Sequence, residues 1–199
     1  MTYKIYQIIY IILAYITGSI PTAFIITKLK TGKDLREFGS RNVGATNASR
    51  LLGKKWFFII SILDAFKGFI VVFIGKKLPF PEYIIIISSL MVILGHSKSI
   101  FLKFQGGKSV ATSAGVFLAF DYKVMLILII FFVIILIVFK YVSLASILTA
   151  ILLPILMYTF HKLTPLFFFS LFISIFVIYK HRENIKRLIK GEELRWGKS

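Results

Sequence analysis

Long apolar runs are the feature that most restricts how this chain can fold. A transmembrane helix needs about 20 mostly apolar residues. Six runs of that kind occur, at residues 4–26, 56–75, 82–100, 123–139, 142–160 and 163–180. They are continuous and do not alternate with polar residues, so they favour helices over the strands of a membrane barrel. With 58% hydrophobic residues, the sequence predicts an all-α, polytopic membrane helix bundle.

The basic residues predict the orientation of these helices. Lys and Arg number 25 against 8 acidic residues, a formal charge of +17. Such an excess suits nucleic acid, anionic lipids or anionic substrates, but in a membrane chain it first indicates cytoplasmic loops. Residues 27–55 hold eight basic residues and residues 180–198 hold seven. Both segments are therefore predicted to be cytoplasmic, with the N-terminus outside, and no nucleic-acid partner is expected.

Six spans would leave the basic C-terminal tail outside, so a seventh crossing is needed. The short apolar run at 110–121 supplies it. A helix of that length reaches about 18 Å, whereas the hydrocarbon core is about 30 Å thick. We therefore expect seven transmembrane helices and a cytoplasmic C-terminus, with a short or broken fourth helix that begins in a polar cavity. No linker or repeat divides the chain, so residues 1–199 are predicted to form a single membrane-embedded domain.

Three polar segments, at 37–50, 95–112 and 181–187, are predicted to face the cytoplasm together. In the first, "EFGSRNVGATNASR", two glycines allow backbone N–H groups to aim at an acceptor. Ser40, Asn42 and Asn47 offer neutral hydrogen bonds, and Arg50 offers a planar fork suited to phosphate. A solvated, positively charged loop is an equally good interpretation of this segment by itself.

The second polar segment contains "GGKS" directly before an apolar run. Gly106, Gly107 and the amide of Lys108 would then lie at a helix N-terminus, where anions are favoured. The spacing does not match the nucleotide-binding P-loop. A glycine hinge for helix packing is the alternative. His96, in the same segment, is either a structural histidine or part of the site.

The third polar segment places His181 and Asn184 three residues apart, on one helical face. Within a predicted span, Asp64 and Lys67 are also three apart. An intramembrane charge suggests function, but each supplies the other's partner, so we favour a structural ion pair. The three histidines are scattered and cysteine is absent, so neither a metal site nor another cofactor is predicted.

Together the three polar segments resemble the PlsY family of bacterial membrane acyltransferases. "GSRNVGATNASR" follows the family pattern Gly-Ser-x-Asn-x-Gly-x-x-Asn-x-x-Arg. "FLKFQGGKSVAT" follows Phe-x-x-Phe-x-Gly-Gly-Lys-x-x-Ala-Thr, and "HRENIKRL" follows His-Arg-x-Asn-Ile-x-Arg-Leu. The resemblance covers essentially the whole chain. The His-x-x-x-x-Asp pair of other glycerol-phosphate acyltransferases is missing, since Phe101, Leu166 and Lys186 stand five residues after the histidines.

The resemblance implies transfer of a fatty acyl group from acyl phosphate to the 1-hydroxyl of sn-glycerol 3-phosphate. The products would be lysophosphatidic acid and phosphate, in the first acylation step of phospholipid synthesis. The enzyme would be a multi-pass protein of the bacterial inner (cytoplasmic) membrane, among membrane lipids, with its active site facing the cytoplasm. A PlsX-like enzyme that makes acyl phosphate is the implied partner.

On this interpretation the expected catalytic residues are His181, Lys108, Arg50 and Asn184. The expected substrate-binding residues are Ser40, Asn42, Asn47, Gly106, Gly107 and His96. The proton acceptor is either His181 or the substrate's own phosphate, and we favour the phosphate.

The proposal requires Arg50, Lys108 and Asn184 to converge in one pocket at the inner membrane surface. A transporter of a small organic phosphate is the main alternative function. A lipid-binding scaffold that uses its basic face on anionic headgroups is a third.

Overall fold

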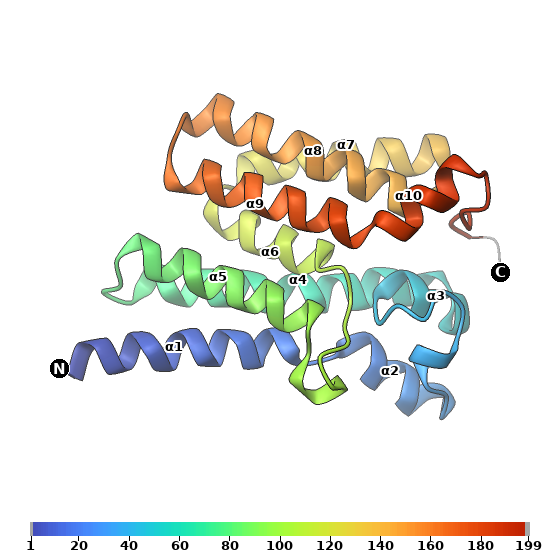
Figure 1. Ribbon diagram of the computed structural model, residues 1–199, viewed down its shortest axis with the longest axis horizontal. Coiled ribbons are helices and arrows are strands. Elements are labelled where there is room, and N and C mark those ends of the chain that lie inside the picture. Colours follow the sequence, from blue (N-terminus) through green and yellow to red (C-terminus); the bar gives the residue numbers. More distant parts are fainter. Residues whose placement is uncertain (1, 198–199) are drawn as a thin grey trace. The chain divides into compact units, whose positions relative to one another are not determined.

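The regular structure of the described residues, 2–197 of the computed structural model, is helical, with one isolated antiparallel bridge between Ser99 and Gln105. The predicted all-α class is confirmed (Figure 1). The chain divides into two units, one up to Phe120 and the other from Asp121. The single domain predicted over residues 1–199 stays a prediction.

The helices of the first unit are α1 (Thr2–Ser19), α2 (Thr22–Thr31), η1 (Leu35–Glu37), α3 (Ala45–Leu52), α4 (Lys54–Lys77), α5 (Glu82–Ser97), η2 (Ile100–Leu102) and α6 (Val110–Phe120). Those of the second unit are α7 (Tyr122–Phe139), α8 (Val142–His161), α9 (Pro165–Lys180) and α10 (Arg182–Ile189).

Four helical segments of the described chain are long and apolar enough to cross a membrane, at residues 3–31 and in α4, α7 and α8. The bent pair α9 and α10 makes a fifth if it counts as one span. The apolar helices α5 and α6 are shorter, and α6, with 11 residues, is roughly 16 Å long. These lengths support a protein that crosses the membrane several times.

Small residues bring the helices of the first unit close together. α1 packs against α5, and α4 packs against α6 (Figure 1). A side chain at Gly68 of α4 would collide with the Thr112 carbonyl of α6, and one at Gly115 of α6 would collide with the Ala65 carbonyl of α4. Close backbone approach at small residues is the usual way in which membrane helices pack, because lipid gives no hydrophobic drive for their association.

The first apolar run was predicted as one continuous span at 4–26, but its helix is broken at Pro21. α1 ends at Ser19 and α2 begins at Thr22. Proline has no N–H and its ring clashes with the preceding turn, so the helical hydrogen bonds stop there. The carbonyl of Ile20 instead accepts hydrogen bonds from the Thr22 N–H (3.1 Å) and from Lys67 Nζ (3.0 Å).

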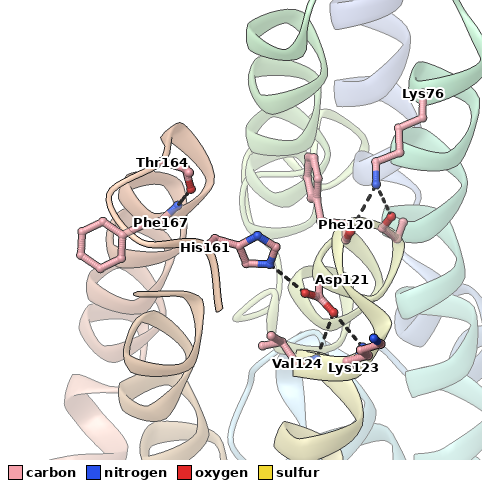
Figure 2. Close-up of polar contacts among 9 residues, drawn as sticks. Lys76, Phe120, Asp121, Lys123, Val124, His161, Thr164 and Phe167 are labelled. Atoms are coloured by element: carbon pink, nitrogen blue, oxygen red, sulfur yellow. Dashed lines mark hydrogen bonds and ion pairs between the residues drawn. The ribbon is translucent and has the colours of Figure 1, made fainter. Parts of the chain in front are cut away.

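Another lysine of the first unit supports the end of α6. Lys76 Nζ donates to the carbonyls of Ala119 (2.7 Å) and Phe120 (3.3 Å), as Figure 2 shows. These carbonyls are among the last of α6, where a positive charge is favourable. The short α6 is therefore held at its C-terminal end by a side chain of α4.

In the second unit α8 packs against both α7 and α9, and α10 bends away from α9 by 57° at His181. Asp121 Oδ1 caps α7 by accepting from the N–H groups of Lys123 (2.8 Å) and Val124 (3.1 Å), and Asp121 Oδ2 lies 2.7 Å from His161 Nε2 (Figure 2). Burial alone would raise the pKa of Asp121, but these hydrogen bonds and the His161 ring hold it below its usual value.

Candidate functional site

The first polar segment folds as a turn followed by the short helix α3, where the sequence analysis expected a loop. Asn47 of α3 is 1% exposed. Its amide nitrogen donates to the carbonyls of Leu35 (3.2 Å) and Phe38 (2.9 Å), and its oxygen accepts from the Ser40 N–H (3.1 Å). Both amide hydrogens are therefore used on the backbone. This geometry supports a role for Asn47 in shaping the segment.

Asn47 also brings Ser40 and Arg50 into one neighbourhood. Gly39 has φ +56°, and a side chain there would collide with the Asn47 side-chain oxygen and lie near Arg50 Cδ. Arg50 follows Asn47 by three residues, so both side chains project from one face of α3. Ser40 is exposed, and Arg50 is half-buried. Asn42 lies on the same turn, with its amide nitrogen next to Gly44.

The glycines of the second polar segment pack directly against His96. The Gly107 N–H donates to the His96 carbonyl at 3.1 Å. A side chain at Gly106 would collide with the carbonyls of His96 and Ser97, and one at Gly107 would collide with the His96 ring and press on the Val43 carbonyl. Val43 belongs to the first polar segment. The structure thus brings the first and second polar segments together at Gly107.

The Gly106–Lys108 turn leads directly into α6, as the "GGKS" pattern predicted. Ser109, at the junction, has φ +62° and is buried. Its hydroxyl donates to the Ile93 carbonyl (2.8 Å), and its own carbonyl accepts from the Ser113 N–H (2.8 Å). Lys108 is half-buried one residue before this junction. The turn therefore presents a lysine and backbone N–H groups near a helix N-terminus, an arrangement that favours anions.

The third polar segment forms the corner between α9 and α10. His181 is buried at this corner, and its Nδ1 lies 2.8 Å from the Val177 carbonyl. A carbonyl only accepts hydrogen bonds, so Nδ1 carries the hydrogen and Nε2 of the neutral ring is left as the acceptor. Asn184, one turn into α10, is also buried, and its amide nitrogen donates to Glu193 Oε1 at 2.6 Å.

Glu193 is a residue of this region that the sequence analysis missed. Its side chain is 6% exposed, and its carboxylate accepts hydrogen bonds from Asn184, Ser143 (2.8 Å) and Arg187 (2.7 Å). Burial alone would raise the pKa of Glu193, but these hydrogen bonds and the charge of Arg187 lower it below its usual value. The turn at Gly191 (φ +71°), visible as a glycine after a basic helix, is the one sequence signal that the chain returns here.

The ion pair predicted between Asp64 and Lys67 is confirmed, with Oδ1 and Nζ 2.9 Å apart. Asp64 has a second neighbour that the spacing did not reveal, because His96 Nδ1 lies 3.6 Å from the same oxygen. His96 therefore lies between the buried pair and the Gly106–Lys108 turn.

The predicted residues thus fall into two groups. Eight of them lie in the first unit, in the two polar segments that meet where Gly107 approaches the Val43 carbonyl, and their cationic side chains and backbone N–H groups suit a phosphate. They are Ser40, Asn42, Asn47, Arg50, His96, Gly106, Gly107 and Lys108. His181 and Asn184 lie together in the second unit. That all of them act at one site stays a prediction.

Known proteins resemble the chain over nearly its whole length. A family model described as glycerol-3-phosphate acyltransferase matches residues 8–191. The glycerol-3-phosphate acyltransferase of Fusobacterium nucleatum is 45% identical over 184 residues, 92% of this chain and 95% of that protein. That of Staphylococcus aureus is 45% identical over 201 residues, covering 95% and 98%.

Two crystal structures of PlsY, an integral membrane glycerol 3-phosphate acyltransferase, are also similar. Its glycerol 3-phosphate form gives a TM-score of 0.91 with 40% identity and 96% coverage of each chain. Its lysophosphatidic acid form gives a TM-score of 0.87 with 38% identity, covering 96% of this chain and 95% of that one.

Proposed function

Because the chain belongs to the glycerol-3-phosphate acyltransferase family, we propose that it transfers a fatty acyl group from acyl phosphate to the 1-hydroxyl of sn-glycerol 3-phosphate. The products are lysophosphatidic acid and inorganic phosphate, in the first acylation step of phospholipid synthesis. The resemblance read from the three polar segments is confirmed at the level of the family. The observation that carries the proposal is the contact at Gly107, which joins the segment of Arg50 to the segment of Lys108.

Two substrates that each bear a phosphate repel one another strongly in a partly dry site. Cations and backbone N–H groups offset that repulsion. Arg50, with its planar fork, and Lys108, with a mobile charge, bind the phosphate groups. Ser40 and Asn42 add neutral hydrogen bonds. Backbone N–H groups next to Gly107 receive the oxyanion that forms at the acyl carbonyl, since the Gly107 N–H itself is donated to the His96 carbonyl.

In the reaction, the 1-hydroxyl oxygen attacks the acyl carbonyl carbon and the bond from that carbon to the phosphate oxygen breaks. The acyl phosphate is already activated, so no covalent intermediate on the enzyme is required. The hydroxyl proton goes to the phosphate of glycerol 3-phosphate, while His181 and Asn184 orient the substrates. In His181→Gln, near-complete loss of turnover with an unchanged KM would instead assign the base to His181.

The finer topology is part of the proposal. We infer seven crossings, with the short α6 as the fourth, the N-terminus outside, the C-terminus cytoplasmic, and the site facing the cytoplasm of a bacterial inner membrane. The positive charge of residues 27–55 and 180–198 supports this orientation. The chain contains no cysteine, so single cysteines placed at Lys33, Leu78 and Lys190 can be labelled with an impermeant maleimide in intact cells. The variant at Leu78 alone should react.

The assay uses purified protein in lipid with glycerol 3-phosphate and, in turn, acyl phosphate, acyl coenzyme A or acyl carrier protein. Of the three donors, acyl phosphate alone should give product, with phosphate and lysophosphatidic acid in equal amounts. Product formation from acyl coenzyme A or acyl carrier protein, which are thioesters, would contradict acyl phosphate as the donor. Transport of labelled substrate into vesicles without product formation would indicate a carrier instead of an enzyme. Stimulation by an added PlsX-like enzyme tests the partner.

Two variants connect this activity to the first unit. Arg50→Ala and Lys108→Ala should each lower kcat/KM on the order of 100-fold, because each removes a charge that offsets phosphate repulsion. Lys103→Ala is the matched control, since Lys103 is an exposed lysine of the same polar segment. Equal effects of Lys103→Ala and Lys108→Ala would mean that general charge, rather than a site at the turn, supports the reaction.

A further inference from the structure

A buried ion pair connects parts of the first unit that the proposed reaction does not itself explain. The side chains of Asp64 and Lys67, in α4, are 3% and 8% exposed. Lys67 Nζ also donates to the Ile20 carbonyl at 3.0 Å, at the break between α1 and α2. A charged side chain that is buried within a membrane protein costs free energy, so such residues are typically paired and have a function. The pair thus joins α4 to the break in the first span.

Asp64 extends this connection to α5. Its Oδ1 lies 3.6 Å from Nδ1 of His96, whose side chain is 10% exposed. At this distance the attraction is electrostatic rather than a close hydrogen bond, and apolar surroundings screen it weakly. The carboxylate therefore lies between the Lys67 ammonium and the His96 ring and holds the ring on the side of α5 that faces α4.

His96 in turn restricts the Gly106–Lys108 turn from two sides. Its carbonyl accepts the Gly107 N–H at 3.1 Å, and its ring occupies the space where a Gly107 side chain would lie. Gly106 is pressed against the backbone of His96 and Ser97 in the same way. A rotation of the His96 ring would open the space that now confines the turn, and Lys108 follows that turn directly.

Building on the proposed function, we propose that Asp64 and Lys67 are positioning residues, which act through His96 to hold the Gly106–Lys108 turn in the conformation that binds phosphate. Neither side chain touches substrate in this proposal. The contacts run from Ile20 to Lys67, Asp64 and His96, and from there to Gly107. This chain of contacts connects the break in the first span to the phosphate-binding turn.

The first test separates positioning from stability. Asp64→Asn leaves a buried ammonium without its counter-charge and can prevent folding, so the informative variant is Asp64→Leu with Lys67→Met, because exchange of a buried pair for apolar residues is often tolerated. We expect this double variant to fold, with kcat/KM for glycerol 3-phosphate lowered on the order of 10- to 100-fold. A folded double variant with wild-type kcat/KM overturns the proposal.

The second test asks whether the effect passes through His96. In a His96→Asn background, the same double substitution should change kcat/KM less than twofold, since coupled residues are not additive. Full additivity overturns the proposal. Asp121→Asn is the matched control, because it removes the charge from another carboxylate–histidine contact that the proposal does not use, and it should leave kcat/KM unchanged.

A third measurement does not depend on turnover. Hydrogen exchange of the peptide covering residues 103–109 should be faster in the double variant than in the wild-type protein, because the Gly107 amide loses protection. If this peptide exchanges at the same rate in both proteins, the positioning proposal is wrong, whether or not the wild-type protein transfers an acyl group. Absence of wild-type transfer with faster exchange in the variant would instead contradict the proposed function and keep the positioning role.

Discussion

A neutral amide holds the 37–50 segment of the first unit in place, whereas a carboxylate holds the 181–187 segment of the second unit. Asn47 makes its hydrogen bonds to backbone groups of Leu35, Phe38 and Ser40. None of these groups titrates, and none changes when a neighbouring side chain is replaced. One side chain, that of Asn47, therefore holds the 37–50 turn through backbone groups alone.

Glu193 makes its hydrogen bonds to the side chains of Ser143, Asn184 and Arg187. These come from α8 and α10, so the carboxylate ties the C-terminal tail and two helices together. Side-chain partners can be removed one by one, and the carboxylate can be protonated. The contacts of Glu193 should therefore weaken step by step with pH and with single substitutions, whereas replacement of Asn47 should remove all the side-chain contacts of its turn together.

The largest effect is expected for Asn47→Leu. The substitution removes three hydrogen bonds: the Ser40 N–H loses its acceptor, and the carbonyls of Leu35 and Phe38 keep only the N–H groups of Phe38 and Arg41. At about 1 kcal/mol for each bond, the free energy of unfolding should fall on the order of 3 kcal/mol. Thermal unfolding in detergent measures it. Asn42→Leu is the matched control on the same turn, because Asn42 makes no side-chain hydrogen bond among residues 2–197. Similar losses in both variants would contradict the backbone-held turn.

A smaller loss is expected for Glu193→Ala, on the order of 2 kcal/mol, because the polar side chain of Asn184 loses its buried acceptor while Arg187 can reach water. Glu193→Gln keeps the shape and should lose less. Both should also lower kcat, Glu193→Ala more than Glu193→Gln, since the hydrogen bond from Asn184 to residue 193 is lost in the first and weakened in the second. Stability that falls with no change in kcat would separate Asn184 from the reaction.

Much of the helical fold could be read from the sequence, because a membrane span is encoded by the length and continuity of its apolar run. The Asp64–Lys67 pair followed from its spacing, and the helix after "GGKS" from its pattern. The break at Pro21 was readable too, but hydropathy alone does not register it, since apolar residues continue on both sides.

The parts of the site that escaped prediction depend on contacts between distant residues. α3 is a short helix, and short helices are stabilised by packing rather than by their own sequence. An asparagine in a glycine-containing segment suits a ligand and a turn equally, so Asn47 could not be assigned. Glu193 pairs with Ser143 across 50 positions, and no local pattern contains that information.

The third prediction uses pH to separate the two regions. The pKa of Glu193 is lowered from 4.5 by its hydrogen bonds and by Arg187, against the opposing effect of burial. A lowered pKa means that the stabilisation is complete above 4.5 and is lost as the pH falls through the lower folded value. The melting temperature should therefore fall as the pH drops below 4.5, by less than in Glu193→Ala, because the protonated acid still forms hydrogen bonds.

The control for this titration is Glu193→Gln, whose melting temperature should depend less on pH in the same range. Asp121 also has a lowered pKa and contributes equally to both proteins. Asp34, whose pKa the Arg36 hydrogen bond lowers to about 2, also contributes equally to both. Identical pH profiles for the wild-type protein and Glu193→Gln would show that Glu193 is not the titrating group.

The smallest effect is expected for Ser143→Ala. It removes one of three donors to the carboxylate, and the Glu193 oxygens keep Asn184 and Arg187, so no buried acceptor is left without a partner. The loss should be about 1 kcal/mol, seen as a small decrease in melting temperature. Because a bond from one donor is gone while the charge stays, the pKa of Glu193 should rise toward its usual value. The acid-induced decrease should still begin near 4.5, but it should be smaller and should end at higher pH than in the wild-type protein. A decrease in stability as large as that of Glu193→Ala would mean that the three hydrogen bonds form or fail as a unit, and the graded response that distinguishes this region from the Asn47 turn would be lost.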